Sequence, residues 1–447
     1  MSFQLKLEKI ELGNYRKFKR YTVDFDPQMT VLVGNNGAGK SSVLSAAAIG
    51  LSDFLLALTP RQRSIKRSDA RIESFDINGI IDRQENYPVT VAATCLMGED
   101  EDVKTWQWTS ALTAADGEND NDFDFDLYGY TRKMYDRIIA GDQSLTLPLL
   151  AYYEADRFWF KTTGSIETRR KRFNRLDGYE NTLVARINLE QILTWFFKMT
   201  AQDLQRSQSI APSEESPIFL AVRDALANCF KSITGSSRVN ITYNLDMDDL
   251  DIEYIDSSNK VQRMALSQLS GGYRSTLCLI ADMAYRMALL NPSLGKNVLT
   301  TPGIVLIDEV DLHLHPLWQA RILGDLCSTF PNIQFVVTTH APAVISSVSS
   351  KHVRILSEGT EALTPSTEIY GSDADRVLIS IMNAPERPVE IQTKFDTFYN
   401  LLDSGDHDAA QKAIDDLAKL IGNDDTDLVG ARTALSLEKA GDLYATD

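Results

Sequence analysis

The stretch Val31–Val43, VLVGNNGAGKSSV, decides the fold that we predict for the rest of the chain. It contains the pattern Gly34-x-x-x-x-Gly39-Lys40-Ser41, with an apolar run before it and helix-forming residues after it. A strand, a glycine-rich loop and a helix in this order direct backbone N–H groups and a positive helix end towards phosphate oxygens. The stretch therefore predicts a phosphate-binding loop, and a glycine turn without function is the alternative.

Eight consecutive residues of this loop are expected to surround a bound nucleotide. They are Asn35, Asn36, Gly37, Ala38, Gly39, Lys40, Ser41 and Ser42. The amine of Lys40 would reach the β- and γ-phosphates, and the hydroxyl of Ser41 would ligate Mg²⁺. The loop thus predicts ATP and Mg²⁺ as cofactors.

A second motif, LSGGYR at Leu269–Arg274, opens a predicted helix that runs to about Leu290. Ser270 and the backbone amides of Gly271 and Gly272 would lie at the positive end of this helix. Such an end is suited to a γ-phosphate.

A third motif, IVLIDE at Ile304–Glu309, has the four apolar residues of a buried parallel strand followed by two carboxylates. Asp308 is expected to hold Mg²⁺ through its water shell, and Glu309 to orient or deprotonate the attacking water. A further apolar strand, Phe335–Thr338, leads to His340. The carboxyl end of such a sheet binds ligands, so His340 is expected to contact the γ-phosphate.

Bulk composition limits the class of protein. The 447 residues carry 62 acidic and 45 basic side chains, a net charge of -17, so any contact with nucleic acid must be local. No run of 18 uncharged apolar residues occurs, and the charged first 14 residues do not resemble a secretory signal. We expect a cytoplasmic protein without a membrane span. The four cysteines are far apart and are expected to be apolar filler.

Two basic segments are candidates for local contact with DNA. In the first, basic residues alternate with aromatic ones, as in proteins that hold a phosphate backbone and stack bases. Its candidate contacts are Arg157, Lys161, Arg169, Arg170, Lys171 and Arg172. The second consists of Arg61, Arg63, Lys66, Arg67 and Arg71. For both segments, pairing with acidic residues of the chain itself is the alternative.

Periodicity predicts an α/β chain with four parts. Expected strands are two within 5–23, an antiparallel meander at 77–81, 89–97 and 105–111, and one starting near 147; expected helices are 42–58, 182–205, 217–233, 391–402 and 409–421. The parts are 1–115 (first half of the ATPase head), 116–265 (acidic loop, basic loop and helical insertion), 266–363 (second half of the head) and 364–447 (a helical region).

Four motifs, GNNGAGKS, LSGGYRS, IVLIDEVDLHLHP and TTHAP, resemble the head of ATP-binding-cassette (ABC) ATPases from the DNA-repair and defence group. Within that group the last two resemble the overcoming-lysogenization-defect ATPases. The segments AYYEADRFW and RLDGYENTL, with the tail from Tyr370 to Pro388, resemble the PtuA-type ATPases of Septu antiphage systems. The implied fold is an ABC-type P-loop head with an antiparallel β-subdomain, a helical insertion and a short C-terminal helical region.

The resemblance implies an ATP sandwich in a two-fold homodimer. Lys40 and Ser41 of one subunit and Ser270 and Gly272 of the other would hold one nucleotide. Arg16 matches a position that approaches the nucleotide in similar heads. The loop with His313 and His315 would contact the partner subunit, a reading favoured over a metal site. No glutamine clearly matches the Q-loop of the family.

Three functions remain open. The chain is predicted to be the ATPase sensor and scaffold of a two-component antiphage complex whose separate His-Asn-His nuclease cuts DNA, because no nuclease motif is evident in the chain itself. The C-terminal helices would dock this nuclease, with electrostatic selectivity from Asp415, Asp416, Asp424 and Asp425. These helices form a hairpin that is expected to be too short for a core of its own, so they must pack on another surface. The alternatives are a retron effector ATPase working with a reverse transcriptase, and a stand-alone repair ATPase.

Overall fold

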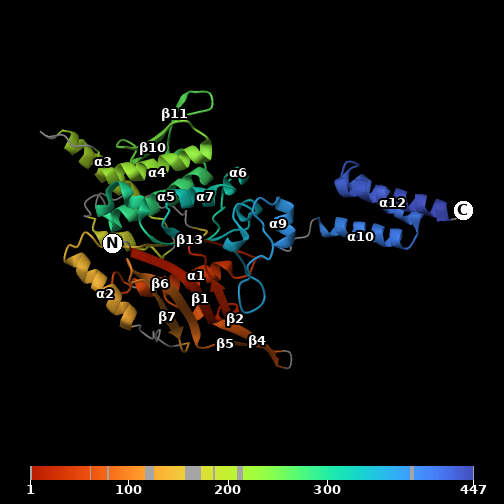
Figure 1. The fold of residues 1–447 in the computed structure, drawn as a ribbon, viewed down its shortest axis with the longest axis horizontal. Coiled ribbons are helices and arrows are strands. Elements are labelled where there is room, and N and C mark those ends of the chain that lie inside the picture. The colour runs from red at the N-terminus through yellow and green to blue at the C-terminus, as the bar shows by residue number, and fades with distance from the viewer. Residues whose placement is uncertain are drawn as a thin grey trace. The chain divides into compact units, whose positions relative to one another are not determined.

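The computed structural model describes residues 3–60, 62–77, 80–115, 125–156, 173–184, 187–208, 215–382 and 387–445. The chain divides into two compact units, Met1–Asp373 and Ala374–Asp447. The first unit, called the head below, contains all the motifs of the predicted nucleotide site (Figure 1).

A five-stranded parallel sheet forms the centre of the head, in the order β14-β3-β13-β12-β8. Its strands are Val353–Ile355, Met29–Val33, Ile333–Thr338, Gly303–Ile307 and Leu149–Tyr153. Every residue of β3, β13, β12 and β8 is buried, which explains their continuous apolar sequences. Because the strands are parallel, their carboxyl ends lie at one edge of the sheet. The phosphate loop, the two carboxylates and the TTHAP segment each come at or directly after the end of one of these strands, so all three lie at that edge.

A second sheet is antiparallel, in the order β2-β1-β6-β7. Its strands are Phe18–Asp24, Phe3–Tyr15, Val89–Glu99 and Lys104–Leu112. The helix α1 (Lys40–Phe54) contacts strands of both sheets and is buried along most of its length. Trp108 of β7 donates a hydrogen bond of 2.9 Å to the carbonyl of Gly50, which fixes α1 to this sheet. The predicted hairpin and the predicted strands at 89–97 and 105–111 are confirmed.

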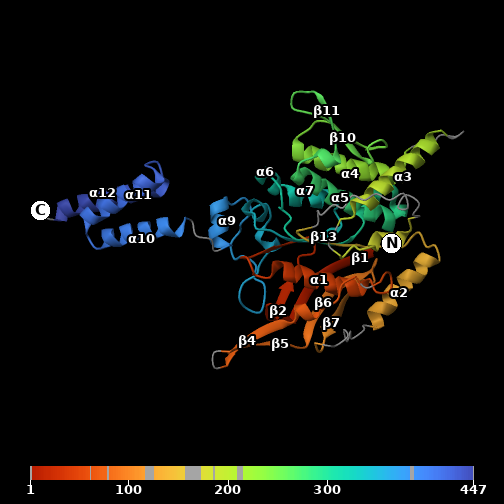
Figure 2. The same cartoon turned by 180° about the vertical axis from the view of Figure 1, so that it is seen from behind.

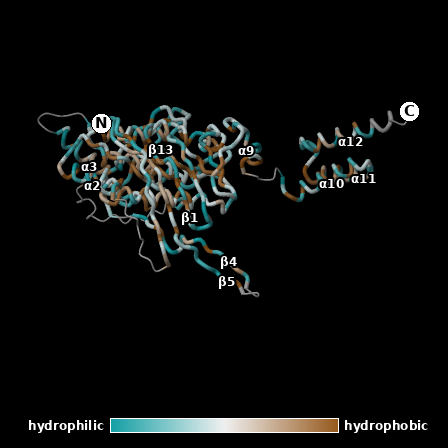
Figure 3. The backbone as a smooth tube through the Cα atoms, turned by 60° about the horizontal axis from the view of Figure 1, so that its bottom comes forward, coloured by the Kyte–Doolittle hydropathy of each residue, from teal (hydrophilic) through white to brown (hydrophobic). Residues whose placement is uncertain are grey.

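The predicted meander strand at 77–81 is wrong. Its described residues belong to a separate hairpin, β4 (Arg71–Ile77) and β5 (Ile80–Asn86), which form their own two-stranded sheet. Figure 3 shows this hairpin extending away from the rest of the head. Ile72 and Ile81 are 57% and 65% exposed, so apolar residues that suggest a core strand in the sequence belong here to a projecting ribbon.

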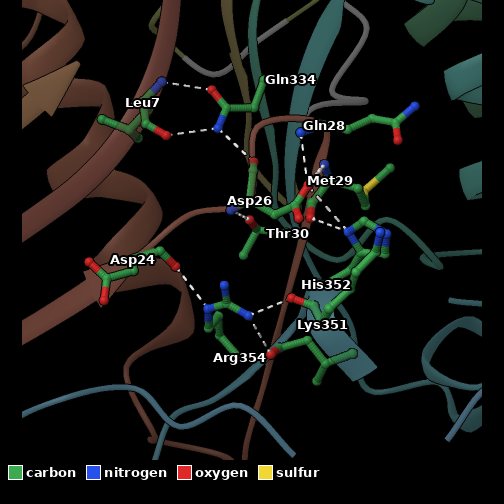
Figure 4. A network of polar contacts seen from close by, with 11 residues as sticks. Leu7, Asp24, Asp26, Gln28, Met29, Thr30, Gln334, Lys351, His352 and Arg354 are labelled. Carbon is green, nitrogen blue, oxygen red and sulfur yellow. Dashed lines mark hydrogen bonds and ion pairs between the residues drawn. The ribbon is translucent and has the colours of Figure 1, made fainter. Parts of the chain in front are cut away.

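Polar side chains join the two sheets (Figure 4). The buried carboxamide of Gln334 in β13 accepts from the N–H of Leu7 at 2.7 Å and donates to its carbonyl at 2.8 Å. It also donates to the carbonyl of Asp26 at 2.8 Å. Arg354 of β14 donates to the carbonyl of Asp24 at 2.9 Å. Gln334 thus satisfies the backbone N–H and carbonyl of Leu7 in β1 from within the parallel sheet, and these bonds fix the position of the two sheets relative to each other.

Helices and a small sheet complete the head. Most of them lie on the side opposite the antiparallel sheet, whereas the helix Phe125–Ile139 lies beside that sheet and is joined to it by an ion pair of Arg137 with Glu99 (Figure 2). The α-helices are α2 (Phe125–Ile139), α3 (Leu189–Ser207), α4 (Pro217–Thr234), α5 (Gly271–Leu290), α6 (Pro316–Gln319), α7 (Ile322–Thr329) and α8 (Pro342–Ile345). The sheet β11-β10-β9 consists of Val261–Ala265, Asp249–Ile255 and Val239–Asn244. Short 3₁₀ helices are Arg67–Asp69, Arg175–Tyr179, Leu266–Gln268, Pro292–Thr300 and Ser350–His352. The helix predicted from residue 182 begins only at 189, where Asn188 caps it.

The second unit contains α9 (Ala374–Ser380), α10 (Val389–Asp403), α11 (His407–Ile421) and α12 (Thr426–Ala445). The expectation that its helical hairpin lacks a core is wrong, because α12 adds a third helix to α10 and α11. Phe398, Ile414 and Leu428, one from each helix, are fully buried in one shared apolar cluster. Asp425 also differs from its predicted role in selecting a partner, since Arg387 binds both of its oxygens at 2.9 Å.

Candidate nucleotide-binding and hydrolysis site

The phosphate loop has backbone geometry that only glycine adopts without strain at its ends. Gly39, the residue before α1, has φ of 99°, and an added Cβ would lie 2.4 Å from the ring of Phe18. At Gly34, which follows β3, an added Cβ would lie 2.7 Å from the carbonyl oxygen of Leu356. The two glycines thus lie closely against neighbouring segments, and no side chain of the described residues caps the N-terminus of α1. These features fit a bound phosphate group.

Lys40 is folded into this loop. Its amine donates to the carbonyls of Gly34 at 2.8 Å and Asn35 at 3.3 Å, and the side chain is largely buried. Burial lowers the pKa of Lys40, whereas the carboxylates of Asp308 and Glu309 act in the opposite direction. The predicted lysine and the predicted carboxylates therefore interact across the ends of β3 and β12.

Thr338, the last residue of β13, holds the segment that carries both carboxylates. Its hydroxyl donates to Asp308 at 2.5 Å and accepts from the N–H of Glu309 at 2.8 Å. Asp308 is buried, and its own N–H donates to the carbonyl of Tyr153 at 2.7 Å. Glu309 has φ of 49°, an uncommon value for a residue other than glycine, asparagine or aspartate. The strand therefore ends at Ile307, and the two residues after it are held by bonds to the neighbouring strands β13 and β8.

His340 lies next to the same group. Burial and then the charge of Lys40 lower its pKa, while Asp311 and Glu309 oppose the shift. Thr339, just before it, donates to Asp311 at 2.5 Å, so the TTHAP segment is bonded to the loop after Glu309. The lowered pKa favours the neutral imidazole at pH 7, and a neutral imidazole can donate one hydrogen bond.

The LSGGYR motif lies apart from the phosphate loop of its own chain. Ser270 precedes α5 and Gly271 begins it, and both are exposed. Among the described residues, no hydrogen bond links either of them to the phosphate loop. Gly272 packs so closely on the loop after Glu309 that an added Cβ would lie 2.4 Å from the carbonyl oxygen of His313. The motif therefore packs against the loop after Glu309 through Gly272, while Ser270 and Gly271 face outward.

Arg16 lies beside the first turns of α1, as the resemblance implied. Its guanidinium donates to Asp69 at 2.9 Å, to Ser45 at 3.2 Å and to Ser42 at 3.5 Å. The neighbouring Lys17 donates to the carbonyl of Gly37 at 2.8 Å. The loop between β1 and β2 thus places two cations at the phosphate loop, and only the first was predicted.

Arg63 has contacts other than those of a DNA-binding surface. Its guanidinium donates to Ser45 at 3.1 Å and to the carbonyl of Leu183 at 2.6 Å, and it forms an ion pair with Glu154. It also lies 4.6 Å above the ring of Tyr152. In the same basic cluster, Arg67 pairs with Glu85 and Arg71 with Glu73. For these three arginines the alternative of pairing within the chain is correct.

Glu154 follows β8 at the edge of the sheet that carries Asp308. Tyr153 of β8 is in register with Ile307 of β12, so the next residues, Glu154 and Asp308, leave neighbouring strands side by side. This neighbourhood depends on a pairing between residues 154 positions apart, so the sequence alone did not reveal that Glu154 lies at the site.

The other predicted DNA contacts, Arg157, Lys161, Arg169, Arg170, Lys171 and Arg172, together with Arg61, lie outside the described residues. Among the residues with coordinates, no group of three or more histidine, cysteine, aspartate or glutamate side chains could hold a metal ion by itself. His313 and His315 form no such group, and His315 instead caps α6. None of the helices in the described ranges is long and apolar enough to cross a membrane. Three of the four cysteines are buried, and Cys327 is partly exposed.

Two family models match the chain. One is described as "AAA domain" and covers residues 9–211. The other is described as "AAA domain, putative AbiEii toxin, Type IV TA system" and covers residues 201–346. Together they span the part of the head that contains the phosphate loop, the LSGGYR motif and the carboxylates.

Similar proteins include two retron ATPases and a Septu protein. The retron Ec83 probable ATPase of Escherichia coli is 30% identical, covering 98% of this chain and 87% of that protein. The retron Vc95 probable ATPase of Vibrio cholerae serotype O1 biovar El Tor is 26% identical, covering 91% and 85%. Septu protein PtuA of Bacillus mycoides is 24% identical over 91% of this chain, which spans about half (49%) of PtuA.

Among solved structures, an SMC head bound to the C-winged helix domain of ScpA has a TM-score of 0.48 at 14% identity, covering 80% of this chain and 98% of that one. The fold described above, in which an ABC-type P-loop sheet is joined to an antiparallel sheet, agrees with the sequence relationships. The chain belongs to the family of the retron Ec83 ATPase and is a homologue of Septu protein PtuA.

Proposed function

We propose that the chain binds ATP with Mg²⁺ and hydrolyses it to ADP and phosphate between the two subunits of a homodimer. One observation carries this proposal: four side chains that could serve the reaction, Lys40, Asp308, Glu309 and His340, interact at one edge of the parallel sheet. Ser270 and Gly271, which suit a γ-phosphate, instead face outward from the same chain.

Each side chain has a task that follows from its surroundings. Lys40 exchanges the carbonyls of Gly34 and Asn35 for phosphate oxygens when ATP enters. Ser41 and Asp308 hold Mg²⁺, which neutralises charge on the phosphates. Glu309 accepts a proton from the attacking water, and the neutral His340 donates a hydrogen bond to the γ-phosphate.

The second subunit completes the site. Ser270, Gly271 and Gly272 of one chain contact the γ-phosphate held by Lys40 of the other, because the N-terminus of α5 carries partial positive charge and is open to a partner. A two-fold dimer then holds two nucleotides. Arg16 lies at the same side of the loop and contacts the nucleotide from its own chain.

Nucleotide binding and hydrolysis by the purified chain test this proposal. Wild type should bind ATP and release phosphate in the presence of Mg²⁺, and Lys40→Ala should not bind. Equal ATP affinity in wild type and Lys40→Ala would refute the assignment of the site.

In the cell, the chain is proposed to act as sensor and scaffold of a defence complex whose separate nuclease, of the His-Asn-His type, degrades DNA. The names of the relatives, retron ATPases and Septu PtuA, support a defence role. The bundle α10–α12 is the proposed docking site for the nuclease. Val389, Leu420 and Leu437 are apolar residues of this bundle that are 72%, 57% and 68% exposed. DNA would reach the complex through the nuclease and the segment 157–172.

A second candidate is an effector ATPase of a retron, working with a reverse transcriptase and its DNA product. The extent of the matches favours it, because the two retron ATPases are covered over 85% and 87% of their length and PtuA over 49%. Co-purification with the product of the adjacent gene decides between them: a nuclease alone supports the Septu type, and a reverse transcriptase supports the retron. Hydrolysis stimulated by DNA without any partner would instead support a stand-alone repair ATPase.

A further inference from the structure

A buried polar triad connects α5 with β8, and the reaction described above does not use it. The hydroxyl of Tyr153 donates to Asp282 at 2.7 Å, and the guanidinium of Arg286 donates to the same carboxylate oxygen at 2.7 Å. The three residues are 3%, 1% and 3% exposed. A carboxylate buried to this degree is stable only when it is paired and hydrogen-bonded, so the triad has one well-defined geometry.

The protonation states of the triad are also well defined. Burial, reinforced by the neighbouring Asp282, raises the pKa of Tyr153 far above its usual value, so its hydroxyl keeps the proton that it donates. Burial alone would lower the pKa of Arg286, but the carboxylate of Asp282 outweighs this effect and raises it. Arg286 also donates to the carbonyls of Gly178 and Glu180, at 3.1 Å and 2.9 Å. Both donors of the triad, the hydroxyl of Tyr153 and the guanidinium of Arg286, therefore keep their protons at neutral pH.

The main chain of Tyr153 has a different partner. Its carbonyl accepts the N–H of Asp308 at 2.7 Å, directly after the register pair Tyr153 and Ile307. One residue thus contacts α5 through its side chain and the proposed Mg²⁺-binding carboxylate through its backbone. The distance along α5 from Ser270 to Asp282 is twelve residues, or about 18 Å of continuous helix.

From these contacts we infer that Tyr153 is a positioning residue that couples two events in one chain. The first is the contact of Ser270 with the nucleotide held by the partner subunit, and the second is the placement of Asp308 at the nucleotide that the chain itself holds. The inference rests on the proposed ATP sandwich, in which α5 of each chain contacts the nucleotide held by its partner. When the N-terminus of α5 is drawn towards that nucleotide, the helix moves as a rigid body and carries Asp282 with it. Tyr153 follows through its hydroxyl and adjusts the backbone to which Asp308 is bonded.

A double-mutant cycle tests the coupling. The first comparison is wild-type homodimer against Tyr153→Phe homodimer, in which only the hydroxyl is lost. The second comparison uses a heterodimer of one Ser270→Arg chain and one Lys40→Ala chain, which keeps a single complete site. There, Tyr153→Phe is placed on the Ser270→Arg chain, because that chain supplies Asp308 to the complete site. The N-terminus of its own α5 carries the Ser270→Arg substitution and therefore does not contact a nucleotide.

The inference predicts a different effect in the two backgrounds. Tyr153→Phe should lower kcat of the homodimer by about five-fold, with KM for ATP changed by less than about two-fold, but should lower the rate of the heterodimer by less than about two-fold. Tyr179→Phe is the matched control: its buried hydroxyl donates to the carbonyl of Pro148 at 2.8 Å, and within the described part of the chain this hydroxyl has no hydrogen bond to α5 or Asp308. Its effect should be the same in both backgrounds.

Three results contradict the inference or its basis. Equal fold-losses for Tyr153→Phe in homodimer and heterodimer would show a purely structural role, and no loss in the homodimer would show that the hydroxyl is irrelevant to the rate. Either result would overturn the coupling and leave the sandwich intact. An inactive parent heterodimer would overturn the sandwich, and the coupling with it. Thermal denaturation of the Tyr153→Phe and Tyr179→Phe chains checks that the two variants have similar stability, so that a difference between their rates does not reflect unfolding.

Discussion

The hydroxyl of Thr338 donates a hydrogen bond to the carboxylate of Asp308 at 2.5 Å and accepts one from the N–H of Glu309 at 2.8 Å. A single side chain at the end of β13 therefore sets two residues at the end of the neighbouring strand. The predicted metal-binding group and the backbone of the predicted water-activating residue are thus both held by this one hydroxyl.

Thr338→Val should disrupt this arrangement with little change of volume. We expect kcat for ATP to fall by about 10- to 100-fold, as for other residues that orient metal ligands, and the Mg²⁺ concentration at half-maximal rate to rise. Thr338→Ser, which retains the hydroxyl, should keep most of the activity. The measurement is the rate of phosphate release over a titration of Mg²⁺, and equal losses in both variants would contradict the role of the hydroxyl.

Glu309→Gln should separate binding from hydrolysis. The amide cannot accept the proton of the attacking water, so we expect kcat to fall by roughly 10²- to 10⁴-fold while ATP remains bound. Size-exclusion chromatography with ATP and Mg²⁺ should then show an accumulated dimer. Failure of the variant to bind ATP would mean that Glu309 holds the nucleotide and is not a base.

His340 should give the reaction a pH dependence of known direction. Because burial and Lys40 lower its pKa below the usual 6.5, the imidazole is neutral at pH 7 and gains a proton only below the pH at which an exposed histidine does. The part of the rate that depends on His340 should therefore decrease on acidification with a midpoint below pH 6.5. The ratio of wild-type to His340→Gln rates, measured over pH, removes the titration of other groups. A ratio that already decreases in step with a pKa of 6.5 or above would contradict the lowered value.

The C-terminal bundle should unfold separately from the head. Phe398 is fully buried in the cluster shared by α10, α11 and α12, so Phe398→Ala should destabilise the bundle by about 3–5 kcal/mol. Tyr399, next to it, is 43% exposed, and Tyr399→Ala is the matched control with a smaller expected effect. Calorimetry should show an early transition for the first variant only, with ATP affinity unchanged in both. Retention of the nuclease by Phe398→Ala at a temperature at which the bundle is unfolded would place the docking surface elsewhere.

The sequence predicted those parts of the site that are encoded by contiguous motifs. The glycines, Lys40 and the pair Asp308 and Glu309 follow strands whose uninterrupted apolar residues reveal a buried parallel sheet. Thr338 was predicted to end an apolar strand and to begin the TTHAP motif, but its role at the site was not predicted because it depends on β13 lying beside β12. Arg63 and Glu154 are 91 residues apart, and nothing in the local pattern of either residue indicates the ion pair.

The errors in the predicted fold have similar causes. The hairpin of β4 and β5 contains exposed isoleucines, and periodicity does not distinguish a projecting ribbon from a strand that belongs to a core sheet. In the C-terminal unit, α10 and α11 were predicted and α12 was not, since the moderate amphipathic pattern after Thr426 did not stand out. Without α12, the apolar faces of α10 and α11 had no visible partner, and the unit was wrongly judged unable to form a core.

Hydrolysis of ATP by the heterodimer of Ser270→Arg and Lys40→Ala chains tests the composite site most directly. Each homodimer should be inactive, because one lacks the signature contact and the other lacks the phosphate-binding amine. Chains co-expressed with different tags and purified through both should regain up to about half of the wild-type rate, since one of two sites is complete. Complete inactivity of this verified heterodimer, or full activity of the Ser270→Arg homodimer, would contradict a site shared between two subunits.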